Sequence, residues 1–170
     1  WRLVNPNARL ESVDGKALQV TLPKQAFLEK TKTTMVLAKP FLMNGATSVN
    51  VWYYIPNARL RNNYKINAVF ADDHGKEFVV GLGGGFDDHI GTPNSRASAL
   101  WKYGFAKTPV KKGATRFLGL RFDTACYKES KGDGVVYLKD FGLERIDYEK
   151  ADLYYVVGGF RDNFSCTGFN

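Results

Sequence analysis

The sequence predicts an all-β protein, a two-sheet antiparallel β-sandwich with the jelly roll as its leading topology. Short segments alternate apolar and polar residues and are rich in β-branched and aromatic side chains, and no segment keeps a helical period. Its 170 residues, 44% of them hydrophobic, suit one packed domain. A lectin-like or immunoglobulin-like sandwich is the rival, but Trp52 and Trp101 both precede Cys126, against the Cys…Trp…Cys order of immunoglobulin domains.

Gly, Pro, Asn and Asp separate the predicted strands from one another. In chain order these strands are residues 16–22, 33–37, 48–55, 64–71, 76–82, 97–105, 115–123 and 135–143. Residues 72–75, Asp-Asp-His-Gly, have the composition of a tight turn, so the strands on either side should pair as an antiparallel hairpin. We expect residues 1–150 to form the sandwich and residues 151–170 to add an edge strand, a tail or a linker.

Aromatic residues recur at every second position in two of these segments. Alternation places Asn50, Trp52 and Tyr54 on one side of the first strand, and Trp101 and Tyr103 on one side of the second. Flat rings beside hydrogen-bonding groups suit ligands with apolar faces and polar edges, such as sugars or bases. Ordinary sandwich core is the alternative, because strand aromatics commonly pack there.

The glycine-rich loop at residues 83–94 is a second candidate contact region. Its Asp87, Asp88 and His89 are suited to contact a ligand or a metal, since loops on rigid sandwiches commonly carry binding residues. A solvated turn is the alternative. The glycines match neither a P-loop nor a dinucleotide-binding fingerprint.

Catalytic constellations are poorly supported. The acids Glu144, Asp147 and Glu149 follow an E-x-x-D-x-E order, which divides them between two faces of a strand and argues against a hydrolase cleft. A polysaccharide lyase that uses His89 and Tyr103 with Arg121 is an open alternative, because residues from separate strands can meet without a sequence signature. With only two histidines, a nucleophilic triad has little support.

Asp140 interrupts an otherwise apolar alternation in the last strand. Burying an unpaired carboxylate is costly, so we expect this side chain to meet a cation or a hydrogen-bond donor. An oxygen cage drawn from Asp140, Glu11 and Asp14 would suit a structural Ca²⁺, and a salt bridge is the alternative. Cys126 and Cys166 either form a disulfide or remain two small buried side chains.

Charge and hydropathy limit the classes of binding partner that we expect. The net charge of +7 favours anionic partners, but alone it is only a weak guide. No apolar run is long enough to span a bilayer, so we expect no membrane partner. The chain starts at Trp1 without a leader, and we expect a secreted protein from which the export signal has been removed. Lysines flank several aromatics, yet nucleic acid is the least expected ligand.

The sequence resembles jelly-roll, galactose-binding-like carbohydrate-binding modules. The resemblance rests on the opening Trp-Arg-Leu-Val, on Gly-Lys-Ala-Leu-Gln-Val at 15–20, on the Trp-Tyr-Tyr strand and on Gly-Val-Val-Tyr-Leu-Lys-Asp-Phe-Gly-Leu at 134–143. It implies a non-catalytic domain that binds a polysaccharide or oligosaccharide and tethers a linked catalytic domain, with Asp140 matching a calcium ligand. Lys139 stands where many relatives have a second acid. A lyase and an adhesion or protein-interaction sandwich are the alternatives.

The resemblance assigns ligand-binding roles by residue type. The platform aromatics are Trp52, Tyr54, Trp101 and Tyr103, and the polar contacts are Asn50, Asn67, Arg121 and Asp123, with Asp87 and His89 on the loop. Strict alternation also places Phe117, Gly119, Arg121 and Asp123 on one face, where Gly119 would leave room for a ligand.

Overall fold

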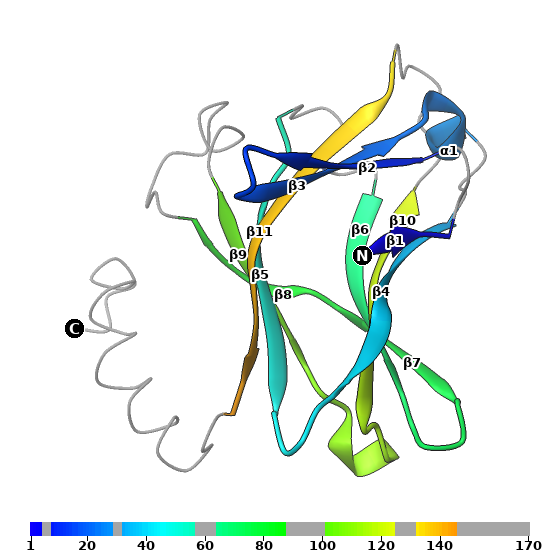
Figure 1. The fold of residues 1–170 in the computed structure, drawn as a ribbon, viewed down its shortest axis with the longest axis vertical. Coiled ribbons are helices and arrows are strands. Elements are labelled where there is room, and N and C mark those ends of the chain that lie inside the picture. Colours follow the sequence, from blue (N-terminus) through cyan, green and yellow to red (C-terminus); the bar gives the residue numbers. More distant parts are fainter. Residues whose placement is uncertain (5–7, 29–31, 57–63, 88–100, 125–131, 146–170) are drawn as a thin grey trace.

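The protein is a sandwich of two antiparallel sheets, and a computed structural model describes residues 1–4, 8–28, 32–56, 64–87, 101–124 and 132–145 (Figure 1). One sheet has five strands in the order β1-β4-β10-β6-β7, and the other has six in the order β2-β3-β11-β5-β9-β8. The strands are β1 (Arg2–Leu3), β2 (Arg9–Val13), β3 (Ala17–Leu22), β4 (Lys32–Leu42), β5 (Ser48–Tyr54), β6 (Tyr64–Ala71), β7 (Glu77–Gly81), β8 (Gly83–Asp87), β9 (Lys102–Lys107), β10 (Arg116–Thr124) and β11 (Gly134–Glu144). The predicted all-β sandwich is confirmed.

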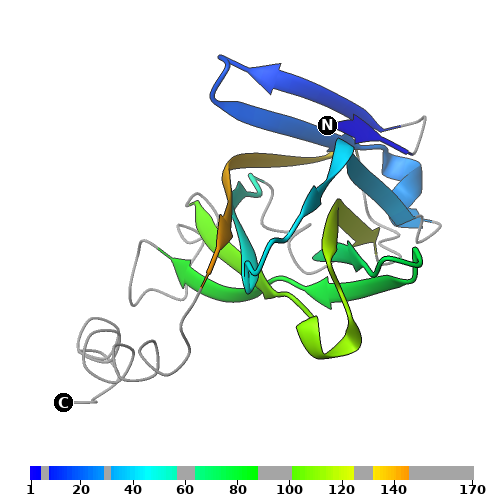
Figure 2. The same cartoon turned by 60° about the horizontal axis from the view of Figure 1, so that its bottom comes forward.

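The connectivity is that of a jelly roll. Successive strands from β3 to β6 alternate between the sheets, β7 stays beside β6, and β9, β10 and β11 alternate again. Each sheet therefore interleaves early and late strands, as two Greek keys require, with β3-β11-β5-β9 facing β4-β10-β6-β7 (Figure 2). The strands β1, β2 and β8 extend the edges.

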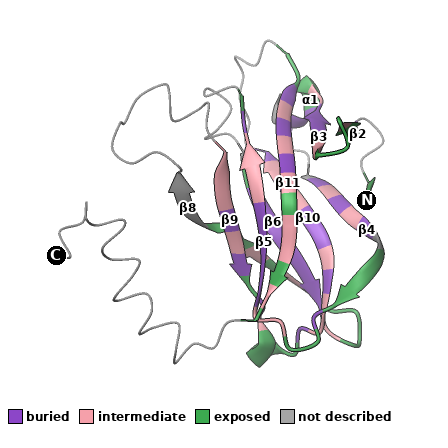
Figure 3. Ribbon diagram, turned by 60° about the vertical axis from the view of Figure 1, so that its left-hand side comes forward, coloured by how far each residue is buried: buried purple, intermediate pink, exposed green. Residues whose placement is uncertain are grey.

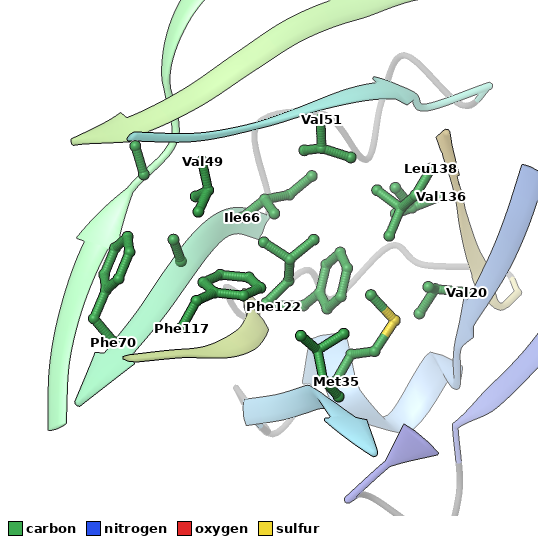
Figure 4. Packing of buried hydrophobic residues seen from close by; sticks show 14 of the residues in the cluster. Val20, Met35, Val49, Val51, Ile66, Phe70, Phe117, Phe122, Val136 and Leu138 are labelled. Atoms are coloured by element: carbon green, nitrogen blue, oxygen red, sulfur yellow. The ribbon is translucent and has the colours of Figure 1, made fainter. Parts of the chain in front are cut away.

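The space between the sheets is filled by one hydrophobic core (Figure 4). Val49 and Val51 of β5 and Val136 and Leu138 of β11 point into it from one sheet, and phenylalanines point into it from the other. The largest fully buried side chains include Phe70, Phe117, Phe122, Leu22, Met35 and Leu120. Burial of such side chains is the main source of stability in a sandwich of this size.

Local structure agrees with most of the predicted turns and strands. The turn at 72–75 joins the antiparallel strands β6 and β7, with Gly75 at φ 84° and the Asp72 carboxylate accepting backbone N–H bonds from His74 and Lys76. The sequence did not indicate β1, β2, β8 or the two short helices α1 (Lys24–Leu28) and η3 (Val110–Lys112). Neither helix in the described part of the chain has the length and apolar character needed to cross a membrane.

A β-bulge in β10 overturns the predicted sidedness of that strand. The pairing with both neighbours shifts between Phe117 and Gly119, so Phe117 is fully buried in the core together with Leu120, while Arg121 lies on the outer side. Gly119 does not leave room for a ligand, because a Cβ there would lie 1.9 Å from the backbone oxygen of Met35 in β4.

A second bulge corrects the expected burial of Asp140. The pairing of β11 with β5 shifts between Lys139 and Gly142, and Asp140 adopts φ 50° and is exposed. Phe141 turns inward instead and stacks on Phe117, with ring centroids 5.1 Å apart. The bulge thus keeps the acid out of the core, and its carboxylate needs no buried cation.

Candidate functional site

The outer face of the six-stranded sheet carries a group of aromatic side chains on β11, on β5, on β9 and on the residue that directly precedes β9. We call this group, Trp52, Tyr54, Trp101, Tyr103, Phe105 and Tyr137, the aromatic face. Every member is half-buried, and buried residues such as Val51, Ala106, Val136 and Leu138 alternate with them along these strands (Figure 3). The alternation in β5 separates Trp52 from Val51, so the ring of Trp52 lies outside the sandwich rather than between its sheets.

Strand register arranges the aromatic face in rows across the sheet. Trp52 is paired with Lys139 on one side and with Tyr103 on the other. The row beside it pairs Tyr54 with Tyr137, and the row on the opposite side pairs Asn50 with Phe105. With the usual strand spacing and rise, three strands and three rows cover roughly 10 Å by 14 Å.

The rings support one another through edge and stacked contacts. Tyr54 lies between Tyr137, with centroids 5.9 Å apart and planes at 18°, and Trp101, with centroids 5.8 Å apart. Trp52 meets Tyr103 edge to face at 5.4 Å. Contacts of this kind fix ring orientation and add stabilisation beyond area burial, so the surface is largely preformed.

Tyr103 is held by a hydrogen-bond network at one border of the aromatic face. Its hydroxyl donates to Glu144 Oε1 over 2.7 Å. Burial, followed by the hydrogen bond and charge of Glu144, raises the pKa of Tyr103 well above its ordinary value, and a hydrogen bond with Asn50 acts in the opposite direction. Tyr103 is therefore a neutral phenol at physiological pH and a poor general base.

Asn50 forms part of the floor of the aromatic face. Its side chain is buried and fills the space above Gly142, where a Cβ would lie 2.9 Å from Asn50 Oδ1. Asn50 was predicted as a polar ligand contact, and its placement beside Tyr103 gives it a role in orienting that ring as well.

Asn67, Arg121 and Asp123 lie together on the other sheet. Their strands, β6 and β10, belong to the five-stranded sheet, and their side chains are on its outer side. Asn67 Nδ2 donates to Asp123 Oδ2 over 2.9 Å, and Arg121 contacts both Asp123 oxygens, at 2.9 and 3.0 Å. These three predicted contact residues interact with one another, and the structure does not bring them to the aromatic face.

The same separation divides the residues of the lyase alternative. Tyr103 is on the outer side of one sheet and Arg121 is on the outer side of the other, so the two residues cannot belong to one active site. His89 lies outside the described residues, as do Asp88, Cys126 and Cys166, and of Asp87 only the backbone, at the end of β8, is described.

The three acids predicted to hold calcium are all exposed. Glu11 is in β2, Asp14 is in the following turn at φ 51°, and Asp140 is in the β11 bulge. In the part of the chain that the structure describes, no three Asp, Glu, His or Cys side chains are grouped so that they could hold a metal ion. The calcium site stays a prediction.

Tyr137 and Lys139 were not assigned to the site from the sequence. Both were considered only as part of the closing motif of the last strand, although alternation with the buried Val136 and Leu138 places them on the outer side. The register with Tyr54 and Trp52 adds them to the aromatic face. Alternation alone indicates that both residues point outward. Their assignment to the aromatic face also requires the knowledge that β11 lies beside β5.

The fold and the site define a β-sandwich domain with an aromatic outer face on one sheet. No known protein family profile matches the chain, and no curated protein matches its sequence. The solved structure of PfGH50B, a glycoside hydrolase, is similar to it with a TM-score of 0.47 and 12% sequence identity, over 86% of this chain and 23% of that one. The chain thus spans less than a quarter of that neighbour.

Proposed function

We propose that this domain binds a polysaccharide on the aromatic face without transforming it, and holds a linked catalytic domain near its substrate in the extracellular medium. The observation that carries the proposal is the position of Trp52, Tyr54, Trp101 and Tyr103 on the outside of a complete core. Half-exposed rings in one preformed layer offer stacking surfaces for sugar rings, while polar groups at the border offer hydrogen bonds to hydroxyls.

The geometry favours binding over catalysis. Tyr103, one of the three tyrosines of the aromatic face, donates its hydroxyl to Glu144 and has a raised pKa, which makes it unsuitable as a base. A broad surface of aromatic rings fits a glycan that lies along the sheet. An adhesion role would use the same surface, and a panel of immobilised glycans separates the two, because an adhesion domain would retain none of them.

The test compares Trp52→Ala with one control variant, Val79→Ala, in affinity electrophoresis through gels that contain individual polysaccharides. We expect Trp52→Ala to lose at least about 2 kcal/mol of binding, about thirtyfold. Val79→Ala, on the outer side of the opposite sheet and 41% exposed, should bind as the parent does.

Unfolding in denaturant shows whether the effect on binding is specific. Phe122→Ala removes a fully buried ring and should cost about 3–5 kcal/mol, whereas Trp52→Ala should cost clearly less because its ring lies outside the core. Unchanged binding of Trp52→Ala, or a stability loss equal to that of Phe122→Ala, would contradict the proposal.

A further inference from the structure

A lysine side chain crosses the aromatic face. Lys139 projects from β11 opposite Trp52, and its Nζ lies 4.3 Å from the ring centroid of Trp101. β5 separates β11 from β9, and Trp101 directly precedes β9, so the side chain reaches over β5. The ammonium consequently lies over the ring of Trp101, a member of the aromatic face from the far side of β5.

This ammonium has no carboxylate partner among the described residues. The described carboxylates Asp133 and Asp123 pair with Arg9 and Arg121, away from the aromatic face. Glu144, the acid at the border of the face, accepts the Tyr103 hydroxyl. A cation–π contact at a partly exposed site is weak, so the Lys139 side chain can leave the indole when a better partner arrives.

The position of the ammonium discriminates between neutral and acidic ligands. A neutral sugar ring that stacks on this side of Trp101 must displace a cation and gains no charge pairing in return. An acidic group brought in by the ligand would pair with that cation, on a surface whose apolar rings reduce competition from water.

We propose that the ligand of the aromatic face is an anionic polysaccharide, one that carries carboxylate or sulfate groups, and that Lys139 is the residue that selects it. The inference rests on the proposed function and adds the substrate class. The net charge of +7 acts in the same direction, because it attracts polyanions over a longer range.

Charge distribution favours a polysaccharide over a nucleic acid. A nucleic acid has a phosphate at every residue and is commonly bound along a series of cations. On the aromatic face the ammonium of Lys139 lies over Trp101, and at the border Lys107 and the acidic residue Glu144 are both paired with Ser48. Such sparse charge matches occasional acidic groups on a sugar chain.

The experiment measures binding to two pairs of polymers that differ only in charge. Polygalacturonate is compared with its methyl ester, which tests carboxylate, and dextran sulfate is compared with dextran, which tests sulfate. A single-stranded oligonucleotide is included as a third polyanion. The variants are Lys139→Met, which keeps side-chain length without charge, Lys139→Arg, which keeps the charge, and Lys111→Met, which removes an exposed lysine of η3 away from the aromatic face.

We expect at least one acidic polymer to bind tenfold or more tightly than its neutral counterpart, and this difference to shrink in 0.5 M salt. Lys139→Met should lose at least tenfold on the acidic polymer while its binding to the neutral one stays equal or improves, because Trp101 is uncovered. Lys139→Arg and Lys111→Met should stay within about threefold of the parent.

Four results would overturn the inference. Equal binding of acidic and neutral polymers that still depends on Trp52 would leave the proposed function standing and remove the role of Lys139. Equal losses in Lys139→Met and Lys111→Met would reduce the effect to net charge. Tighter binding of the oligonucleotide than of any polysaccharide would assign the face to nucleic acid, and retention of no glycan by the folded protein would remove both proposals.

Discussion

Substitution of Gly119 by alanine should be among the most damaging changes in this domain. Gly119 is in the β10 bulge at φ 151°, and an added Cβ would lie 1.9 Å from the Met35 carbonyl oxygen and 2.7 Å from Val36 Cα. These atoms belong to the backbone of β4, so no side-chain rotation relieves the clash. To restore an ordinary contact of 3.4 Å, the two strands must separate locally by about 1.5 Å.

The cost of that separation can be worked from its parts. Ladder hydrogen bonds beside the bulge would lengthen beyond bonding range, at about 1 kcal/mol each plus the cost of buried groups left unpaired. Backbone strain at positive φ adds about 1–3 kcal/mol. We therefore expect a loss of about 4 kcal/mol or more, a large part of the roughly 5–15 kcal/mol that typically holds a domain together.

Gly15 supplies a matched control for the conformational part of this cost. It also has a positive φ, 65°, but nothing lies within 4 Å of an added Cβ, so Gly15→Ala should cost only about 1–2 kcal/mol. The assay is urea unfolding followed by tryptophan fluorescence. Equal unfolding free energies for the two variants would refute the claim that Gly119 is required by the approach of β4.

Three further predictions concern the aromatic face and the acids. The pKa of Tyr103 is raised in the folded state, so the contribution of this residue to stability is complete below the ordinary tyrosine value of about 10 and declines above it. The free energy of unfolding should therefore fall less steeply above about pH 10 in Tyr103→Phe than in the parent protein. Gly142→Ala should displace the Asn50 carboxamide and weaken glycan binding severalfold with a smaller effect on stability, and a variant that binds normally in affinity electrophoresis would show that the floor adapts. Chelation of calcium should leave the melting temperature unchanged, because the predicted ligand Asp140 is exposed. A drop of several degrees in the parent protein that is absent from Asp140→Asn would instead establish the calcium site.

Alternation predicted the aromatic face well where strands are regular. In β5 every residue from Val49 to Tyr54 is on the side that a two-residue period assigns, and Tyr103 and Phe105 follow the same rule in β9. The same rule failed in β10 and β11, because each contains a bulge that shifts the period. Phe117 and Asp140 were assigned to the wrong sides for this single reason.

The order of the strands in each sheet could not be predicted from the local sequence pattern either. Arg121 and Tyr103 each looked accessible on their own strands, but pairing between distant segments puts them on different sheets. Tyr137 joins the aromatic face only because β11 inserts between β3 and β5. Such contacts depend on the tertiary fold, which one sequence does not specify through periodicity alone.

The bulge in β11 accommodates one extra residue between two regularly paired halves of that strand. It converts a strand that presents Tyr137 and Lys139 outward into one that sends Phe141 inward, all within a few residues. Loss of Asp140 would restore a simple zigzag, in which Lys139 and Gly142 still lie opposite Trp52 and Asn50 with one residue between them. The bulge is therefore the place in β11 where the strand can lose one residue and keep both its outward and its inward side chains on their present sides.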